Sequence, residues 1–352
     1  MESDKKNRAE IRSPESSSLK ELCASLHQLA IDLETPEKNE FYRWPQPQLD
    51  LCAKYGVFKW FLEERYGGFG WSDQELTLGY LALGSACQTT TFVITQRTGA
   101  CQRIAQSDNE YVRNQLLPVL LEGTHFSTVG ISHLTTSKRY LDQPVLRAIE
   151  TQKGFILNGF TPWVTGATQA DTIVVGAECE DGRQILIVVP THISGIKIAP
   201  PNQLVSFSSS QTSRVSFEQV EVDAKWLLAG PTQNVLSQGI GTRTGGYQTC
   251  TLALGLAGAA IEFILSECQI RKDIISAYGV AEYDILPNSP FGNVNIIDED
   301  GEEKKVDFIE WTFKDYNFSQ QWDIRLKLIS DMAKMFVEAK TARIIAEGLN
   351  SE

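Results

Sequence analysis

The chain has 352 residues, of which 42% are hydrophobic and 22% are charged, and its formal net charge is -12 at pH 7. This composition is that of an ordinary globular protein, long enough for a large core in one or more domains. The acidic balance excludes a nucleic-acid backbone as the main partner, because phosphate binding needs clustered Lys and Arg. A phosphate-bearing cofactor is still allowed, since it requires only a few local donors.

The seven cysteines and four histidines show no metal-ligand spacing, since no two cysteines are separated by two residues. We therefore expect no metal site. The polar N-terminal stretch MESDKKNRAEIRSPESSSLK lacks the apolar run of a signal peptide, and the cysteine count is odd. These features predict a cytoplasmic protein with buried, reduced thiols.

The first part of the chain has a helical pattern, after a tail over residues 1–17 that we expect to be disordered. In LKELCASLHQLAIDLE, which begins at Leu19, the leucines recur close to every 3.6 residues. A second helix is predicted over 74–105, and a third over 109–123 that is broken or bent near Pro118. Together these helices form the expected N-terminal domain, residues 18–124.

From residue 125 to 230 the pattern changes to short β segments separated by Gly, Pro, Asn and Asp. The segments are FSTVGIS, GFILNG, DTIVVGAE, QILIVVP, GIKIAP and SRVSFEQVEV. Their spacing predicts a central antiparallel β-barrel or sandwich. The fold class expected is therefore α+β in several parts: an all-α N-terminal domain, this β domain, and a C-terminal α-helical bundle.

Helical patterning returns over residues 235–352. Its first segment contains the apolar run CTLALGLAGAA at 250–260, too short for a bilayer, which takes about 20 apolar residues, so no transmembrane segment is expected. Gly255 and Gly258 would let a neighbouring helix approach closely. Over 275–320 the Pro, Gly and Asp content predicts a long loop or small excursion inserted into the helical pattern.

One stretch poses a question of its own: NGFTPWVTGATQADTIVVGAE, residues 158–178, joins two predicted strands. Such a connection does not need an indole, yet Trp163 lies in it. One interpretation is that the ring is a large core residue. The sequence raises the question of what this ring packs against.

Several motifs, in order along most of the chain, resemble the acyl-CoA dehydrogenase family. The similar segments are EERYGGFGWSDQEL (63–76), the stretch 154–178 around Trp163, VSFEQVEVDAKWLLAG (215–230), the Ala-rich 253–273, and 330–343. The resemblance implies FAD as cofactor, an acyl-CoA or acyl-carrier thioester as substrate, an electron-transfer flavoprotein as acceptor, and a homo-oligomer. The chain ends at Glu352, and we expect the end of the family's last helical domain to be missing from it.

The resemblance also implies site residues on the flavin side. Trp163 would pack along the isoalloxazine ring and Thr165 would donate a hydrogen bond near its reactive N5, with Val164 between them. Ser132 would hold the pyrimidine side of the flavin through its hydroxyl. Arg271 would reach the FAD pyrophosphate of a neighbouring subunit, although a solvated charge at a helix end explains it nearly as well.

On the substrate side the chain departs from the family pattern. In the loop VGISHLTTSKRYLDQ, His133 and Leu134 stand where Glu and Pro would, which leaves Ser137 as a candidate substrate contact. We expect His133 to be an exposed loop histidine, with a tuned acid or base as the alternative.

The family's oxidation needs a glutamate that removes the α-proton of the thioester. In most members this base lies in a loop that we expect this chain to lack. Some members place it at the start of the Ala-rich helix, where this chain has Gln248, which cannot accept a proton at neutral pH. Glu262 lies about 20 Å further along the same helix. Three alternatives therefore remain: an FAD-dependent acyl-CoA dehydrogenase, a flavin-dependent monooxygenase of the same fold, or a non-catalytic flavin- or acyl-binding relative.

Overall fold

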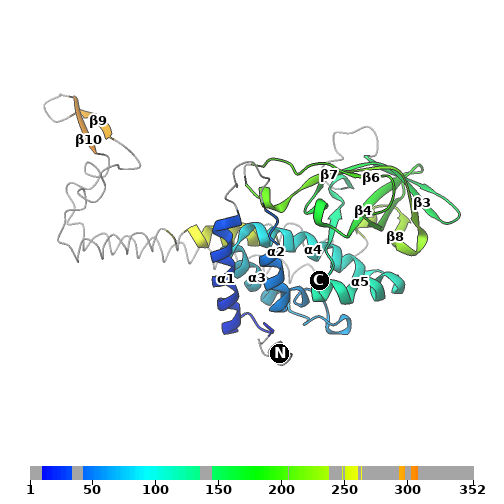
Figure 1. Ribbon diagram of the computed structural model, residues 1–352, viewed down its shortest axis with the longest axis horizontal. Coiled ribbons are helices and arrows are strands. Elements are labelled where there is room, and N and C mark those ends of the chain that lie inside the picture. The colour runs from blue at the N-terminus through cyan, green and yellow to red at the C-terminus, as the bar shows by residue number, and fades with distance from the viewer. Residues whose placement is uncertain are drawn as a thin grey trace. The chain divides into compact units, whose positions relative to one another are not determined.

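The structure is a computed structural model, shown in Figure 1. It describes residues 10–33, 43–134, 145–204, 206–237, 248, 250–260, 263, 293–297 and 303–307. The chain divides into two compact units, one containing the described residues up to Leu256 and one spanning Ala257–Arg343.

The first unit begins with helices whose ends follow from local sequence. The α-helices are α1 (Ser17–Leu33), α2 (Gln46–Lys54), α3 (Asp73–Ala86), α4 (Gln88–Gln106) and α5 (Glu110–Glu122). Ser72 and Glu75 form a capping box at the start of α3, each side chain satisfying a backbone N–H of the other. Asn109 caps the start of α5, and Gly123 ends it with φ of 77°.

Two predictions about these helices need correction. The predicted helix over 74–105 is divided into α3 and α4, because Cys87 has extended backbone angles, φ -156° and ψ 98°. Cys87 is buried, so tertiary packing and not a Gly or Pro sets this break. Of the predicted break or bend near Pro118, the break is absent, since α5 continues as one helix through that residue.

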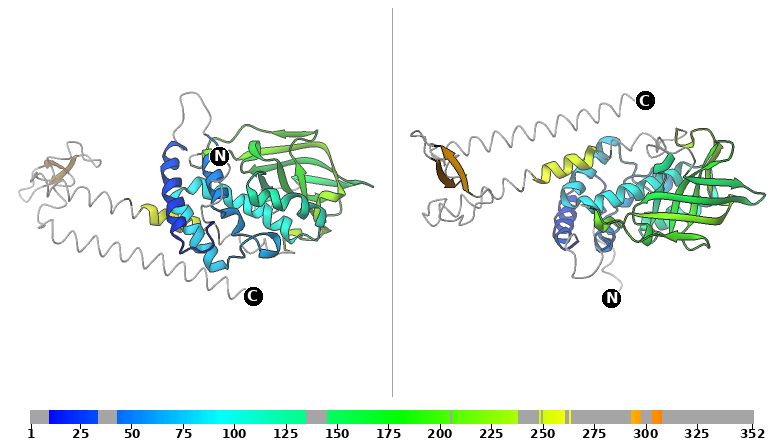
Figure 2. Two further views of the ribbon diagram at one scale, coloured as in Figure 1. Left: turned by 60° about the horizontal axis from the view of Figure 1, so that its bottom comes forward. Right: turned by 90° about the horizontal axis from the view of Figure 1, so that it is seen from above.

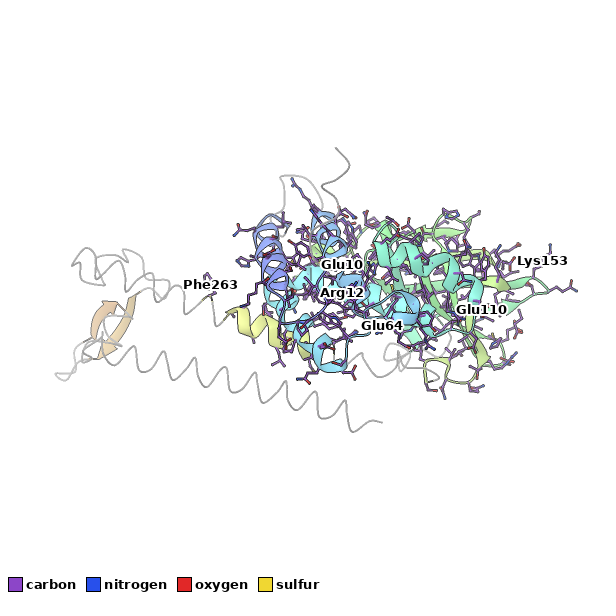
Figure 3. The ribbon with its side chains drawn as sticks, turned by 90° about the horizontal axis from the view of Figure 1, so that it is seen from below. Glu10, Arg12, Glu64, Glu110, Lys153 and Phe263 are labelled. Atoms are coloured by element: carbon purple, nitrogen blue, oxygen red, sulfur yellow. The ribbon has the colours of Figure 1, made fainter. Side chains whose placement is uncertain are left out.

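The prediction of a disordered tail over residues 1–17 is wrong for residues 10–17, because this part of the chain contacts the helices and leads into α1. Ile11 is fully buried, its N–H donates to the carbonyl of Tyr55, and its carbonyl accepts from Nε1 of Trp60 at 2.9 Å. Glu10 and Arg12, labelled in Figure 3, flank it and form an ion pair at 3.0 Å. A single apolar residue in a polar stretch has no periodicity, so the sequence pattern could not indicate this anchor.

The β domain lies beyond about residue 125, where the sequence places it. The strands are β1 (Ser127–Gly130), β2 (Leu146–Glu150), β3 (Gly154–Val164), β4 (Thr172–Cys179), β5 (Gln184–Pro190), β6 (Ile196–Ile198), β7 (Ser213–Asp223) and β8 (Leu227–Thr232). They form one sheet in the order β6-β7-β3-β2-β4-β5-β8, and β1 also pairs with β4. Lys153 marks the tip of the β2–β3 hairpin in Figure 3.

The sheet is mixed and not purely antiparallel as predicted. β4 pairs in parallel with both β1 and β2, while the remaining pairings are antiparallel in the part of the sheet that is described. A continuous apolar run is typical of a strand buried on both faces, and β4 and β5 are buried along almost their whole length. A run of apolar residues does not reveal the direction in which a strand pairs. The sequence therefore could not distinguish a mixed sheet from an antiparallel one.

β4 and β5 are buried on both faces because each face packs against a separate apolar core. On one face of the sheet, Ile104 of α4 and Leu120 of α5 belong to one apolar cluster with Val174 of β4 and Val188 of β5. Both views of Figure 2 show α4 and α5 against the sheet. The opposite faces of these strands join a second core supplied by strands and their loops alone. The sheet therefore curves over its own core, as expected for a barrel or sandwich.

The prediction of buried, reduced thiols holds for some of the described cysteines and not for others. Cys52, Cys87, Cys101 and Cys179 are free and buried, whereas Cys250 is exposed. Burial raises the pKa of the half-buried Cys23 to about 11, so this thiol stays protonated at neutral pH.

The end of the first unit confirms one close helix contact. A Cβ built on Gly255 would lie 3.0 Å from the carbonyl oxygen of Leu81 and 3.2 Å from the carbonyl carbon of Gly84, so this position needs Gly. Ser85 Oγ donates to the carbonyl of Gly255 at 2.8 Å. Among the described helices, none is long and apolar enough to cross a membrane.

The second unit contains β9 (Asn293–Ile297) and β10 (Glu303–Asp307), which pair antiparallel. This hairpin falls inside the segment 275–320 that we predicted to be a loop or small excursion. The predicted C-terminal helical bundle lies outside the described residues, apart from the helical residues at 248, 250–260 and 263.

Candidate functional site

Trp163 belongs to β3 and not to the connection after it. The pairing of β3 with β7 shifts register between Thr161 and Val164, so Trp163 lies in this irregular step. The indole is 52% exposed, whereas Val164 next to it is fully buried in the strand core. This exposure excludes Trp163 as a core residue and presents a flat apolar surface outside the strand. The side chain of Val164, another residue predicted to contact the cofactor, packs into the core.

The two residues after Val164 are fixed by a distant loop. Thr165 is 4% exposed, and its Oγ1 lies 3.2 Å from Oγ1 of Thr212. The N–H of Gly166 donates to the carbonyl of Ser210 at 2.8 Å. Gly166 has φ of 64°, and a Cβ built on it would lie 2.5 Å from the Trp44 ring, so Gly is required by backbone angle and by space.

The loop before β7 is itself held in place by unusual backbone and side-chain contacts. Phe207 and Gln211 have φ of 63° and 47°, a region that few non-Gly residues adopt. The Phe207 ring packs against Phe92 of α4, with ring centroids 5.2 Å apart. Gln211 Oε1 accepts from Thr168 Oγ1 at 2.8 Å and from Gln169 Nε2 at 3.0 Å. These contacts attach the loop to both α4 and the turn after Trp163.

Three buried hydroxyls form a chain that ends at Thr165, two residues after Trp163. Ser210 is fully buried and Thr212 is 6% exposed. Ser210 Oγ lies 2.8 Å from Thr212 Oγ1, which in turn lies 3.2 Å from Thr165 Oγ1. The sequence prediction found Trp163 and Thr165 but missed Ser210 and Thr212. The signal that the sequence offered for them was the run SFSSSQTS before a strand. In the structure several of its small hydroxyl residues are buried.

Ser132 lies in the short 3-10 helix η3 (Ser132–Leu134), which packs against β3 after the end of β1. The structure therefore brings its segment beside the strand that carries Trp163. His133 in the same turn is 2% exposed, and its Nε2 donates to the carbonyl of Gly176 at 2.7 Å. The prediction of an exposed loop histidine is wrong, because this ring fastens η3 to β4. Leu134 also packs there, 2.3 Å from a Cβ built on Gly176.

The predicted substrate-side positions are only partly described. Gln248 is half-buried, and its Nε2 lies 3.5 Å from the hydroxyl of Tyr80 in α3. Ser137, Arg271 and Glu262 lie outside the described residues. Among the residues that are described, no group of three or more His, Cys, Asp or Glu could hold a metal ion.

Comparison with known proteins assigns this architecture. No family model matches the chain. Over 237 residues the chain is 27% identical to a probable acyl-CoA dehydrogenase, YngJ, of Bacillus subtilis, an alignment covering 65% of this chain and 62% of that protein. Over 245 residues it is 22% identical to the mitochondrial isobutyryl-CoA dehydrogenase of Bos taurus, covering 68% of this chain and 58% of that protein. The chain thus spans less than two thirds of the length of these relatives.

The structure is also similar to solved structures. Butyryl-CoA dehydrogenase from Megasphaera elsdenii matches with a TM-score of 0.60 and 21% identity, covering 73% of this chain and 68% of that chain. At this identity the match shows the fold alone. This fold agrees with the fold class expected from the sequence, and the sequence relatives are named as acyl-CoA dehydrogenases.

Proposed function

We propose that the chain binds FAD, with Trp163 as one wall of the flavin site and Thr165 as its hydrogen-bonding neighbour. The observation that carries this proposal is the 52% exposure of Trp163 beside a hydroxyl held by a buried loop. An exposed indole on a rigid strand suits a planar, polarisable ring system. The residues present therefore fit a flavin on this side of the site. Ser132 and Arg271 remain proposed contacts to the cofactor.

The reaction proposed is the α,β-desaturation of an acyl thioester, with the β-hydrogen leaving as hydride to the flavin. The resemblance to acyl-CoA dehydrogenases and the named activities of the relatives support it. An acyl-CoA or an acyl-carrier thioester would be the substrate, and an electron-transfer flavoprotein the acceptor. We also propose a homo-oligomer in the cytoplasm, the location that the buried free thiols favour.

Gln248 favours a second candidate function. Its amide nitrogen reaches the Tyr80 hydroxyl, and an amide cannot take a proton from substrate at neutral pH. If position 248 is where a base would act, this chain either oxidises without that base, as a flavin-dependent monooxygenase would, or binds its ligand without turnover. The Gln248→Glu variant tests whether position 248 is where a base would act, because a carboxylate facing the substrate should raise desaturation activity.

FAD binding is tested first, by reconstituting the purified chain and recording its visible absorbance. The wild-type chain should bind FAD, and Trp163→Leu should bind it roughly tenfold more weakly because the stacking surface is lost. Tyr111→Leu is the matched control, since Tyr111 is also an exposed aromatic, at 43%, but lies on α5. A wild-type chain that stays colourless with excess FAD rejects the proposal.

The reaction is tested next, by anaerobic titration of the FAD-bound chain with a panel of acyl-CoA thioesters. Bleaching of the flavin absorbance supports the desaturation. An FAD-bound chain that no thioester reduces, with or without Gln248→Glu, would leave the dehydrogenase reaction without support and favour the second candidate.

A further inference from the structure

The direction of the hydrogen bonds among Ser210, Thr212 and Thr165 follows from counting protons. Ser210, Thr212 and Thr165 carry one hydroxyl proton each, and two hydrogen bonds connect their oxygens. Two protons are therefore used within the chain of hydroxyls and one is left for another acceptor. Which residue keeps that remaining proton decides what the site offers to a ligand.

The surroundings of the three hydroxyls favour one arrangement. Ser210 is fully buried, and Thr212 is the partner of its Oγ within the described part of the chain. If Ser210 kept the remaining proton, a buried donor would stay unsatisfied, which native structures avoid. If Thr212 kept the remaining proton, Ser210 and Thr165 would both donate to Thr212. The proton of the buried Thr212 hydroxyl would then have no acceptor. Thr165 is 4% exposed, but it is the member of the three that lies in the Trp163 segment, two residues after the exposed indole, so a flavin bound there would supply the acceptor that its remaining proton needs.

We propose that Thr212 is a positioning residue: Ser210 donates to Thr212, Thr212 donates to Thr165, and Thr165 is thereby fixed as a hydrogen-bond donor toward the bound flavin. This inference rests on the proposed function and extends it. It assigns two residues to the site that contact no ligand, and it states which partner donates in each bond. The register of β3 with β7, in which Val164 pairs with Ser213, brings the two threonines together.

A fixed donor matters because oxidised flavin offers a lone pair at N5, which accepts a hydrogen bond. A threonine hydroxyl without the Thr212 contact can rotate and present either its proton or its lone pairs. Thr212 removes this freedom by occupying an acceptor site of Thr165. The Thr165 donor is then oriented before the cofactor arrives.

The test uses isosteric variants of the full chain and three readouts: the dissociation constant for FAD, the visible absorbance of bound FAD and its midpoint potential. Thr165→Val should weaken FAD binding about threefold to tenfold through the loss of one hydrogen bond. Thr212→Val should change all three readouts in the same direction by a smaller factor, and Thr212→Ser should restore them because it keeps the hydroxyl. Thr161→Val is the matched control, a fully buried threonine of β3 whose hydroxyl has no hydrogen-bond partner in the described structure.

The double variant Thr165→Val with Thr212→Val decides whether Thr212 acts through Thr165. We expect it to equal Thr165→Val alone in affinity, spectrum and potential, since coupled residues are non-additive. Additive effects, or a Thr212→Val variant that behaves like Thr161→Val, would overturn the inference while FAD binding by the wild type stands. Absence of FAD binding by the wild type would instead overturn the proposed function, and the inference with it.

Discussion

Gly166 offers a direct test of how the turn after Trp163 is held. Its φ of 64° favours glycine, and a Cβ at this position would lie 2.5 Å from the Trp44 ring and 2.7 Å from the Phe126 ring. Those two rings pack edge to face with centroids 5.1 Å apart, so neither can withdraw without disturbing the other. We therefore expect Gly166→Ala to destabilise the fold through two separate effects.

The two effects can be estimated. A left-handed backbone costs a residue with Cβ about 1–2 kcal/mol, and forcing a methyl into packed rings costs about 1–3 kcal/mol. The free energy of unfolding should therefore fall by about 2–5 kcal/mol in Gly166→Ala. The same shift would displace Thr165, so FAD binding should weaken as well.

Gly182→Ala is the matched control, measured with Gly166→Ala by urea unfolding followed by circular dichroism. Gly182 has φ of 81°, but a Cβ built on it meets nothing within 4 Å, so only the backbone effect applies. Both substitutions change the unfolded chain equally, and their difference isolates the steric contribution of the rings. If Gly166→Ala destabilises no more than Gly182→Ala, the reasoning about Trp44 and Phe126 is refuted.

Two further predictions concern contacts that join helices and sheet. Asn109 caps α5 through its Oδ1, and its Nδ2 donates at 2.8 Å to two main-chain carbonyls at residues 225 and 227. Asn109→Ala should reduce the free energy of unfolding by about 2–3 kcal/mol, and Asn109→Ser, which keeps only the cap, by less; an Asn109→Ser variant as stable as the wild type in urea unfolding would contradict the role of the amide, and equal losses in the two variants would contradict the role of the cap. Desolvation lowers the pKa of His125 below 6.5, against the opposing charge of Asp171, so the fold favours the neutral ring. Stability should then be complete above pH 6.5 and decrease as the pH falls below it, because the unfolded chain binds the proton more readily, and His125→Gln should flatten this part of the stability-pH curve.

The sequence predicted the elements whose signals are local. The leucine spacing of α1 and the alternating or continuous apolar runs of β5 and β7 depend on neighbours within one element. β8 was missed because it contains Gly230 and Pro231, residues that argue against a strand. It lies at the end of the strand order and pairs with β5 there, a place where such residues are tolerated.

Features set by distant contacts could not be predicted in this way. Ile11 is buried because Tyr55 and Trp60 bind its backbone, and nothing near residue 11 indicates that. The burial of His133 likewise depends on the carbonyl of Gly176, more than forty residues away. In both cases a polar or irregular segment is ordered by a partner that only the fold supplies.

The candidate site likewise contains residues that local sequence predicts and residues that only distant contacts bring in. Trp163 and Thr165 were predicted because they lie in one motif, and in the structure Trp163 is exposed whereas Thr165 is buried in contact with Thr212. Ser210 and Thr212 were missed because their link to Thr165 exists only where β7 lies beside β3. The residues proposed to face the ligand come from one segment, and the residues that hold them come from another. The pairing of the two strands must therefore orient the site. Register changes between β3 and β7 should therefore alter flavin binding even when Trp163 and Thr165 are intact.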